Sequence, residues 1–145
     1  MNVQTDRLNT FLVSVFNNIL RLEEENLHKV CKNLSVTELH VLDAVHWLGN
    51  GACMADIAAR LHVTAGTLTA SVKTLEQKGY LIRKRSENDK RRVVAVLTER
   101  CAPVLYAHSS FHKNLCGDAV KNLSQHEISV LGDALQNLHA YFSKL

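Results

Sequence analysis

Two short segments in the middle of the chain carry side chains suited to contacts with phosphate groups and base edges. The first, residues 64–73, is rich in small and hydroxyl-bearing side chains. Its candidate contact residues are Thr64, Ala65, Gly66, Thr67, Thr69 and Lys73. Threonine hydroxyls can bond phosphate oxygens or base edges, and threonine methyls can contact the thymine methyl. Thr64 also precedes an expected helix, where free N–H groups and the positive end of the dipole favour an anion.

The second segment, residues 83–92, places cations on both sides of a short turn. Its candidate contact residues are Arg83, Arg85, Asp89, Lys90, Arg91 and Arg92. Asp89 is included because an ion pair with Arg91 would aim that guanidinium before any contact forms. A solvated, charged hairpin is the alternative explanation. The adjacent hydroxyl-rich segment favours contact with phosphates and with a minor groove.

The pattern from Met54 to Thr98 predicts the elements that position these side chains. A short apolar-periodic helix is followed by a turn and a second helix whose inner side is Leu68, Val72 and Leu75. Two β-prone runs, 81–85 and 93–97, then flank a charged turn. This order is a helix-turn-helix with a β-hairpin wing, which indicates double-stranded DNA as the partner. The alternative is that the small-residue helix packs against another protein helix.

Long amphipathic segments lie on both sides of this unit. We expect helices over residues 8–31, 35–48, 98–122 and 124–142. Ser35 with Glu38 and Ser124 with Glu127 have the spacing of capping boxes. The expected fold class is mainly α with a small β-hairpin wing: a winged helix-turn-helix with long N- and C-terminal dimerisation helices.

The chain is expected to form one domain, residues 1–145. Its dimerisation lobe would be approximately residues 1–34 and 100–145, and its DNA-binding lobe approximately residues 35–99. The long terminal helices cannot all bury their apolar faces within one small lobe. A two-fold homodimer in which they interlock is the economical solution.

Composition narrows the function classes. The net charge is +3, yet residues 50–100 hold ten Lys and Arg against five Asp and Glu, so they carry all the positive excess. No apolar run approaches the roughly 20 residues needed to span a bilayer, and no export signal is evident, which predicts a cytoplasmic protein without membrane contact. No catalytic motif is evident, so we expect no enzyme. A winged helix used only for protein contacts is the rival class.

The four cysteines, Cys31, Cys53, Cys101 and Cys116, are widely spread and form no C-x-x-C pair. Such thiols are usually buried small hydrophobes, and this interpretation is favoured over a redox sensor. A disulfide framework is not expected.

The end of the second helix and the wing resemble the MarR family of winged-helix repressors. The residues that carry the resemblance are Leu75, Glu76, Lys78, Gly79, Arg83, Asp89, Arg91, Leu97 and Thr98. The resemblance implies that Arg91 enters the minor groove. Many family members carry an arginine where Ala70 stands and an acid where Lys73 stands. These departures shift the expectation from direct base reading toward recognition of the DNA backbone and shape.

Other segments are similar to MarR-type repressors of bacterial fatty-acid synthesis genes. They are FNNILRLEEENL (16–27), SVTELHVLDAV (35–45), TAGTLTASV (64–72) and HSSFHKNL (108–115). This resemblance implies that a long-chain acyl group on acyl carrier protein is the corepressor, with the chain in an apolar tunnel. The candidate ligand-binding residues are Phe16, Ile19, Leu20, Val41, Val45, His108, Phe111 and His112. For each apolar one, ordinary core packing is the alternative.

His108 and His112 are four residues apart, which places both on one helix face. The favoured interpretation is a polar network between helices. The alternative is a zinc site that draws its ligands from His40, His108, His112 and Glu24, because MarR-type zinc sensors use comparable helices. No cofactor is otherwise expected.

Overall fold

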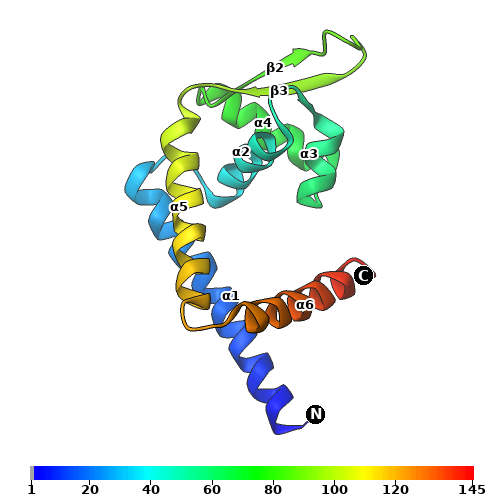
Figure 1. Ribbon diagram of the computed structural model, residues 1–145. Coiled ribbons are helices and arrows are strands. Elements are labelled where there is room, and N and C mark those ends of the chain that lie inside the picture. Colours follow the sequence, from blue (N-terminus) through cyan, green and yellow to red (C-terminus); the bar gives the residue numbers. More distant parts are fainter. Residues whose placement is uncertain (1) are drawn as a thin grey trace. The chain divides into compact units, whose positions relative to one another are not determined.

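The computed structural model describes residues 2–145, which form six helices and three strands (Figure 1). In chain order they are α1 (Val3–Val30), α2 (Val36–Leu48), β1 (Ala52–Cys53), α3 (Met54–Leu61), α4 (Ala65–Gln77), β2 (Leu81–Arg85), β3 (Val93–Leu97), α5 (Cys101–Val120) and α6 (Gln125–Phe142). The chain divides into two compact units, Met1–Ser109 and Ser110–Leu145, so that α5 belongs to both. The expected fold class is confirmed.

Side-chain caps explain where several helices begin. The Asn2 side chain accepts a hydrogen bond from the Thr5 backbone, so α1 starts at Val3 rather than at the expected residue 8. Both expected capping boxes are present at Ser35 and Ser124. The prediction that α5 begins at Thr98 is wrong, because the Thr98 backbone N–H bonds to the Tyr80 carbonyl and α5 begins at Cys101.

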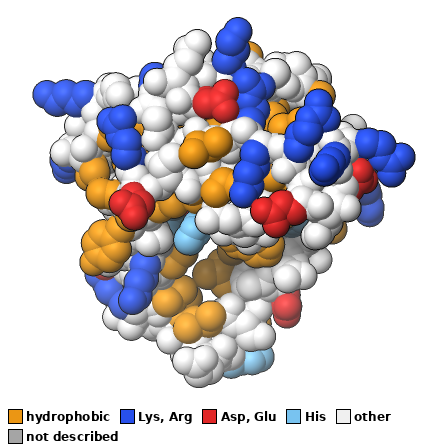
Figure 2. Space-filling model, turned by 90° about the horizontal axis from the view of Figure 1, so that it is seen from above, with side chains coloured by type: hydrophobic (Ala, Val, Ile, Leu, Met, Phe, Trp, Pro, Cys, Tyr) orange, Lys and Arg blue, Asp and Glu red, His pale blue; other side chains and the backbone are white. Residues whose placement is uncertain are grey.

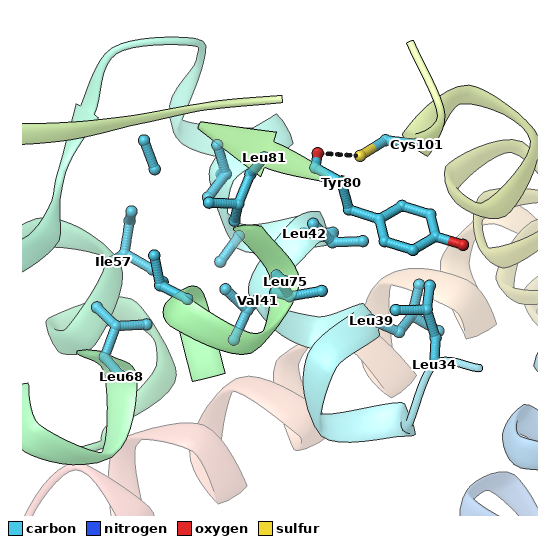
Figure 3. Packing of buried hydrophobic residues seen from close by; sticks show 14 of the residues in the cluster. Leu34, Leu39, Val41, Leu42, Ile57, Leu68, Leu75, Tyr80, Leu81 and Cys101 are labelled. Carbon is cyan, nitrogen blue, oxygen red and sulfur yellow. Dashed lines mark hydrogen bonds between the residues drawn. The ribbon is translucent and has the colours of Figure 1, made fainter. Parts of the chain in front are cut away.

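The core of the first unit lies between α2, α3, α4 and the sheet (Figures 1 and 3). Its fully buried side chains include Leu42, Val45, Ile57, Val72 and Leu75. Each buried side chain of this kind stabilises the fold by roughly 1.5–3 kcal/mol relative to an exposed one. The buried inner side predicted for α4 is confirmed, and it fixes which side of that helix faces outward.

The sheet is antiparallel with the strand order β1-β3-β2. The hairpin strands have the predicted bounds, and Lys84 pairs with Val94 in their register. The sequence did not indicate β1, a two-residue strand in which Ala52 pairs with Ala95. This strand joins the start of the helix-turn-helix to the wing.

The helical segments α1 and α6 each carry a run of exposed apolar side chains within their own unit. Phe11 and Phe16 on α1 are exposed, as are Leu131, Leu135 and Phe142 on α6. In a single chain these surfaces contact water. None of the helices within residues 2–145 is both long and apolar enough to cross a lipid bilayer.

Candidate nucleic-acid interface

The reading face, defined here as the exposed side of residues 64–73, is formed by small and polar side chains. Its exposed members are Thr64, Ala65, Gly66, Thr67, Thr69, Ala70 and Lys73. Every residue expected on this side of the helix is therefore exposed. Small side chains let the helix backbone approach a groove floor closely, because no large group stands between them.

The N-terminus of α4 is capped by its own threonines. The Thr64 hydroxyl accepts from the Thr67 backbone N–H at 3.2 Å and donates to the Thr67 hydroxyl at 2.9 Å. The Thr67 oxygen is thus an acceptor in that bond and keeps its own hydrogen for another acceptor. Thr69 donates to the Ala65 carbonyl at 2.8 Å, which uses its hydrogen and leaves the oxygen lone pairs available to accept a bond. Thr67 can donate to a phosphate, and Thr69 can accept from a base edge.

Arg91 is the exposed cation of the wing, with 92% of its side chain accessible. Its Nε donates to Asp89 Oδ1 at 3.2 Å, and its backbone N–H donates to the same oxygen at 3.1 Å. The backbone hydrogen bond, followed by the guanidinium contact, lowers the pKa of Asp89. The structure therefore places the expected ion pair at the turn, with the other guanidinium nitrogens open to solvent.

Three other wing arginines fasten the hairpin instead. Arg83 Nη2 and Nε lie 3.1 and 3.3 Å from Glu76 Oε1, and its backbone N–H donates to Glu76 Oε2 at 2.9 Å. These contacts lower the pKa of Glu76, the backbone bond first. Arg85 donates to the Lys90 carbonyl, and Arg92 donates to Cys53 Sγ. The spacing of the residues could not distinguish these bracing arginines from Arg91.

Lys84 and Lys90 complete the cationic surface of the wing, and both are exposed. Viewed from above, Lys and Arg side chains spread across the face and acidic ones are fewer (Figure 2). Lys84 was not named among the candidate contacts. It alternates with Arg83 and Arg85 along β2, so its side chain lies on the opposite face of the hairpin from theirs. A second missed feature is Arg60, whose guanidinium stacks 3.8 Å from the ring centre of the exposed Trp47.

A buried carboxylate lies beside two histidines in the first unit. Glu23 is 4% exposed, and its Oε1 is 2.9 Å from His40 Nε2 and 3.3 Å from His108 Nδ1. His108 Nε2 lies 3.7 Å from Asp43 Oδ2, and the His108 hydrogen bond is the main cause of the lowered pKa of Asp43. His40 and His108 therefore share a polar network with Glu23, while the network expected for the pair His108 and His112 stays a prediction.

The carboxylate that lies beside both histidines is Glu23 and not the candidate Glu24, which is exposed. Glu23 lies four residues after Ile19 and four before the buried Leu27, so all three share one helix face. That spacing was the signal that could have found it. His112 belongs to the second unit, where its ring contacts Phe111.

The candidate acyl-binding residues have different environments. Val41 and Val45 are part of the core of the first unit. On α1, Phe16 and Leu20 are exposed and Ile19 is half-buried, while Phe111 lies in the second unit. A surface pocket of about 580 Å³ between α2 and the start of α5 is lined instead by Asp43, His46, Leu97, Cys101, Leu105 and Tyr106, among others.

Two of the four thiols follow the expected behaviour of buried small hydrophobes. Cys53 and Cys101 are buried, whereas Cys31 is half-buried and Cys116 is exposed. Burial is the main cause of the raised pKa of Cys101. All four are free thiols.

Comparison with known proteins shows similarity to DNA-binding regulators. The sequence profile of the MarR family matches residues 34–93. The regulator SarZ of Staphylococcus epidermidis is 35% identical over 81 residues, which cover 56% of this chain and 53% of that protein. The chain thus matches about half the length of this relative. MhqR of Bacillus subtilis is 28% identical over 114 residues, or 79% of this chain and 77% of that protein.

Among solved structures, Streptococcus pneumoniae FabT in complex with DNA is similar over nearly the whole chain. Its identity is 35% and its TM-score is 0.87, with 97% of this chain and 98% of that chain covered. A mutant of Escherichia coli MarR complexed with operator DNA is 23% identical, with a TM-score of 0.70 over 95% of this chain and 99% of that chain. The second likeness concerns the fold alone.

Proposed function

The chain belongs to the MarR family, and from this premise we propose that it is a transcriptional repressor that binds double-stranded DNA. The observation that carries the proposal is the pairing of a small, hydroxyl-lined reading face with a highly exposed Arg91 at the wing turn. In this arrangement α4 enters a major groove and the wing follows the adjacent backbone into a minor groove. FabT, which is similar over 97% of the chain, was solved in complex with DNA.

The phosphate backbone supplies most of the binding free energy in this proposal. Arg91, Lys84 and Lys90 present exposed cations on the wing, and α4 presents its N-terminal N–H groups. Sequence preference comes from Thr69 and from the shape of the duplex at the wing. Asp89 holds Arg91 in place before contact, which lowers the entropy lost on binding.

The binding unit is a homodimer. The exposed apolar side chains of α1 and α6 are the surfaces that a second copy would cover, and burial stabilises by roughly 25 cal/mol per Å². A two-fold dimer reads a pseudo-palindrome whose half-sites lie one helical turn apart, about 34–36 Å. Native mass spectrometry tests this point, since a monomer at micromolar concentration contradicts it.

The proposed targets are fatty-acid synthesis genes, with long-chain acyl groups on acyl carrier protein as corepressor. The segments that resemble repressors of those genes support this proposal, as does the likeness to FabT over the whole chain. The acyl chain would contact apolar side chains of α1, α2 and α5. Addition of acyl carrier protein loaded with a long acyl chain should tighten DNA binding, and the unloaded carrier should not.

Selection from a random pool of duplexes tests the repressor proposal, because the protein itself then picks out the sequence it binds. The expected result is an enriched pseudo-palindrome with half-sites about one turn apart. A protein-interaction module of the winged-helix class would enrich no sequence and would retain no duplex at low salt. That outcome would overturn the proposal.

A zinc-responsive repressor is the second candidate, and the Glu23 network favours it. Glu23 Oε1 lies 2.9 Å from His40 Nε2 and 3.3 Å from His108 Nδ1, and carboxylate oxygens and imidazole nitrogens are donor atoms that zinc accepts. Two results would support a zinc-responsive repressor. The wild-type protein should bind one equivalent of zinc that His108→Ala does not bind, and zinc should change the DNA affinity of the wild type. If the DNA affinity is the same with zinc and with a chelator, the protein is not a zinc-responsive repressor.

A further inference from the structure

The C-terminal end of α4 leads into a three-residue turn, which hydrogen bonds from several other segments of the chain hold in place. We call Lys78, Gly79 and Tyr80 the corner. Gly79 has φ 83°, and a Cβ at that position would lie 3.0 Å from Arg100 Nη1. A side chain larger than hydrogen is therefore disfavoured by both the backbone conformation and the neighbouring guanidinium.

The segment between β3 and α5, together with the first residue of α5, forms hydrogen bonds with every carbonyl of the corner. Arg100 Nη1 donates to the Lys78 carbonyl at 2.7 Å, and the Thr98 hydroxyl donates to the Gly79 carbonyl at 2.7 Å. The Tyr80 carbonyl accepts from the Thr98 backbone and from the Cys101 thiol, as Figure 3 shows for the thiol. These bonds satisfy carbonyls that a helix end otherwise leaves to solvent.

The connection between α1 and α2 and the first turn of α2 hold the side chains of the corner. Lys78 Nζ lies 3.0 and 2.9 Å from the two carboxylate oxygens of Glu38 and also donates to the Asn33 carbonyl. The Tyr80 hydroxyl lies 3.2 Å from Asn33 Oδ1 and 3.0 Å from Cys31 Sγ. Burial, followed by the Cys31 contact, raises the pKa of Tyr80 to about 12, so its hydroxyl keeps its proton.

The Lys78–Glu38 pair differs from an ordinary surface ion pair. Glu38 is 12% exposed and Lys78 is 29% exposed, so water screens the pair only in part. Glu38 also accepts the Ser35 backbone N–H in the capping box of α2. One carboxylate therefore joins the start of α2 to the end of α4, 40 residues away in the sequence.

We propose that Lys78 is a positioning residue for DNA binding, acting through Glu38 and Asn33 and not through a phosphate. The inference rests on the proposed function. Its ammonium fixes the C-terminal end of α4 to the α1–α2 connection and to the first turn of α2, and this sets the angle at which the reading face meets the groove. Because α4 has 13 residues and rises about 1.5 Å per residue, a tilt of about 5° at the corner moves its N-terminus by roughly 2 Å. Such a shift removes threonine contacts without unfolding the helix.

The test compares the removal of either partner of the pair. Lys78→Met and Glu38→Gln should each weaken duplex binding on the order of tenfold, and the double variant should be little worse than either. Glu38→Gln is decisive, because it removes a negative charge and electrostatics alone predicts tighter binding. Glutamine still fits the capping box, which protects α2. Lys78→Arg should retain most of the affinity.

The dependence of affinity on salt separates positioning from direct contact. Lys78→Met should keep the slope of the logarithm of affinity against the logarithm of salt concentration, since no phosphate contact is lost. Lys32→Met is the matched control: it removes an exposed charge from the same connection and should bind like the wild type. Circular dichroism of each variant checks that the helices persist.

Two results would overturn the inference alone. One is a slope reduced by about 0.9 in Lys78→Met together with normal or tighter binding by Glu38→Gln, which identifies Lys78 as a phosphate contact. The other is wild-type affinity in both variants. A wild-type protein that binds no duplex would overturn the proposed function and this inference with it.

Discussion

The two ends of α4 are held in opposite ways. At the N-terminal end the reading face is exposed, and its hydroxyls bond only within the helix. At the C-terminal end the corner is fastened by bonds to residues from two other parts of the chain. The difference shows how such a helix can be rigid and still available: the rigid end sets the orientation, and the free end has bonds left to make.

The wing repeats this division. Arg83 is fastened to Glu76 on α4, and its side chain is 31% exposed, whereas Arg91 is 92% exposed and held only by its neighbour Asp89. Two arginines of one hairpin therefore differ in role: Arg83 braces the hairpin, and Arg91 is exposed and available to bind a partner. Substitution of a fastened residue should therefore change stability, and substitution of a free residue should change DNA binding.

Tyr80→Ala should have the largest effect, because it empties the buried centre of the corner. The expected loss is about 3 kcal/mol in the free energy of unfolding, typical of a large buried side chain replaced by alanine. Chemical denaturation measures this. Tyr80→Phe keeps the ring and removes only the hydroxyl contacts, so its loss should be near 1 kcal/mol. Equal losses in both variants would contradict the packing role of the ring.

Arg91→Ala should affect binding and leave stability almost unchanged. Its side chain is exposed, so its removal costs little in folding. We expect duplex affinity to fall on the order of tenfold and the salt slope to become shallower by about 0.9. Fluorescence anisotropy with a labelled duplex measures both. Unchanged affinity would show that Arg91 at the wing turn does not contact DNA.

Glu76→Gln should change the response to acid. The pKa of Glu76 is lowered in the folded state, so its contribution to stability is present above its unfolded pKa and is lost as pH falls through the folded value. The variant should therefore lose less stability than the wild type between about pH 5 and pH 3. Thermal unfolding across that range is the measurement. Glu87→Gln, on the same wing and exposed, serves as control and should follow the wild-type curve.

Thr69→Ala should have the smallest effect on folding, within about 0.5 kcal/mol, because the residue is exposed. We expect the substitution to reduce sequence preference instead. The variant should bind the selected operator several-fold more weakly while binding to unrelated duplexes stays the same. Parallel titrations of the two duplexes measure the ratio. An equal loss of affinity for both duplexes would show that Thr69 contacts the DNA backbone and not a base edge.

Local pattern was sufficient to predict most of the fold. The strands 81–85 and 93–97 have their predicted bounds, and the caps at Ser35 and Ser124 form as expected. These features depend on residues within a few positions of one another. β1 was missed because two residues give no periodicity, and its pairing with β3 depends on a segment more than 40 residues away.

The distinction between fastened and free residues could not be predicted from the sequence. Lys78 and Glu38 are 40 positions apart, and Arg92 meets Cys53 across 39. Side-chain type and spacing indicate that a residue is charged but not which partner it finds in the fold. Glu23 is an intermediate case, since its place on the buried stripe of α1 was readable but its two histidine neighbours come from other helices.

A salt titration of the wild-type protein on duplex DNA is the sharpest test of binding through the phosphate backbone. We expect tight binding at about 50 mM salt, with the logarithm of affinity falling steeply and linearly with the logarithm of salt concentration, because several cations displace counterions from phosphates. We also expect single-stranded DNA of the same sequence to compete poorly. Absence of duplex binding at low salt, or binding independent of salt, would show that the protein does not bind DNA through its phosphates.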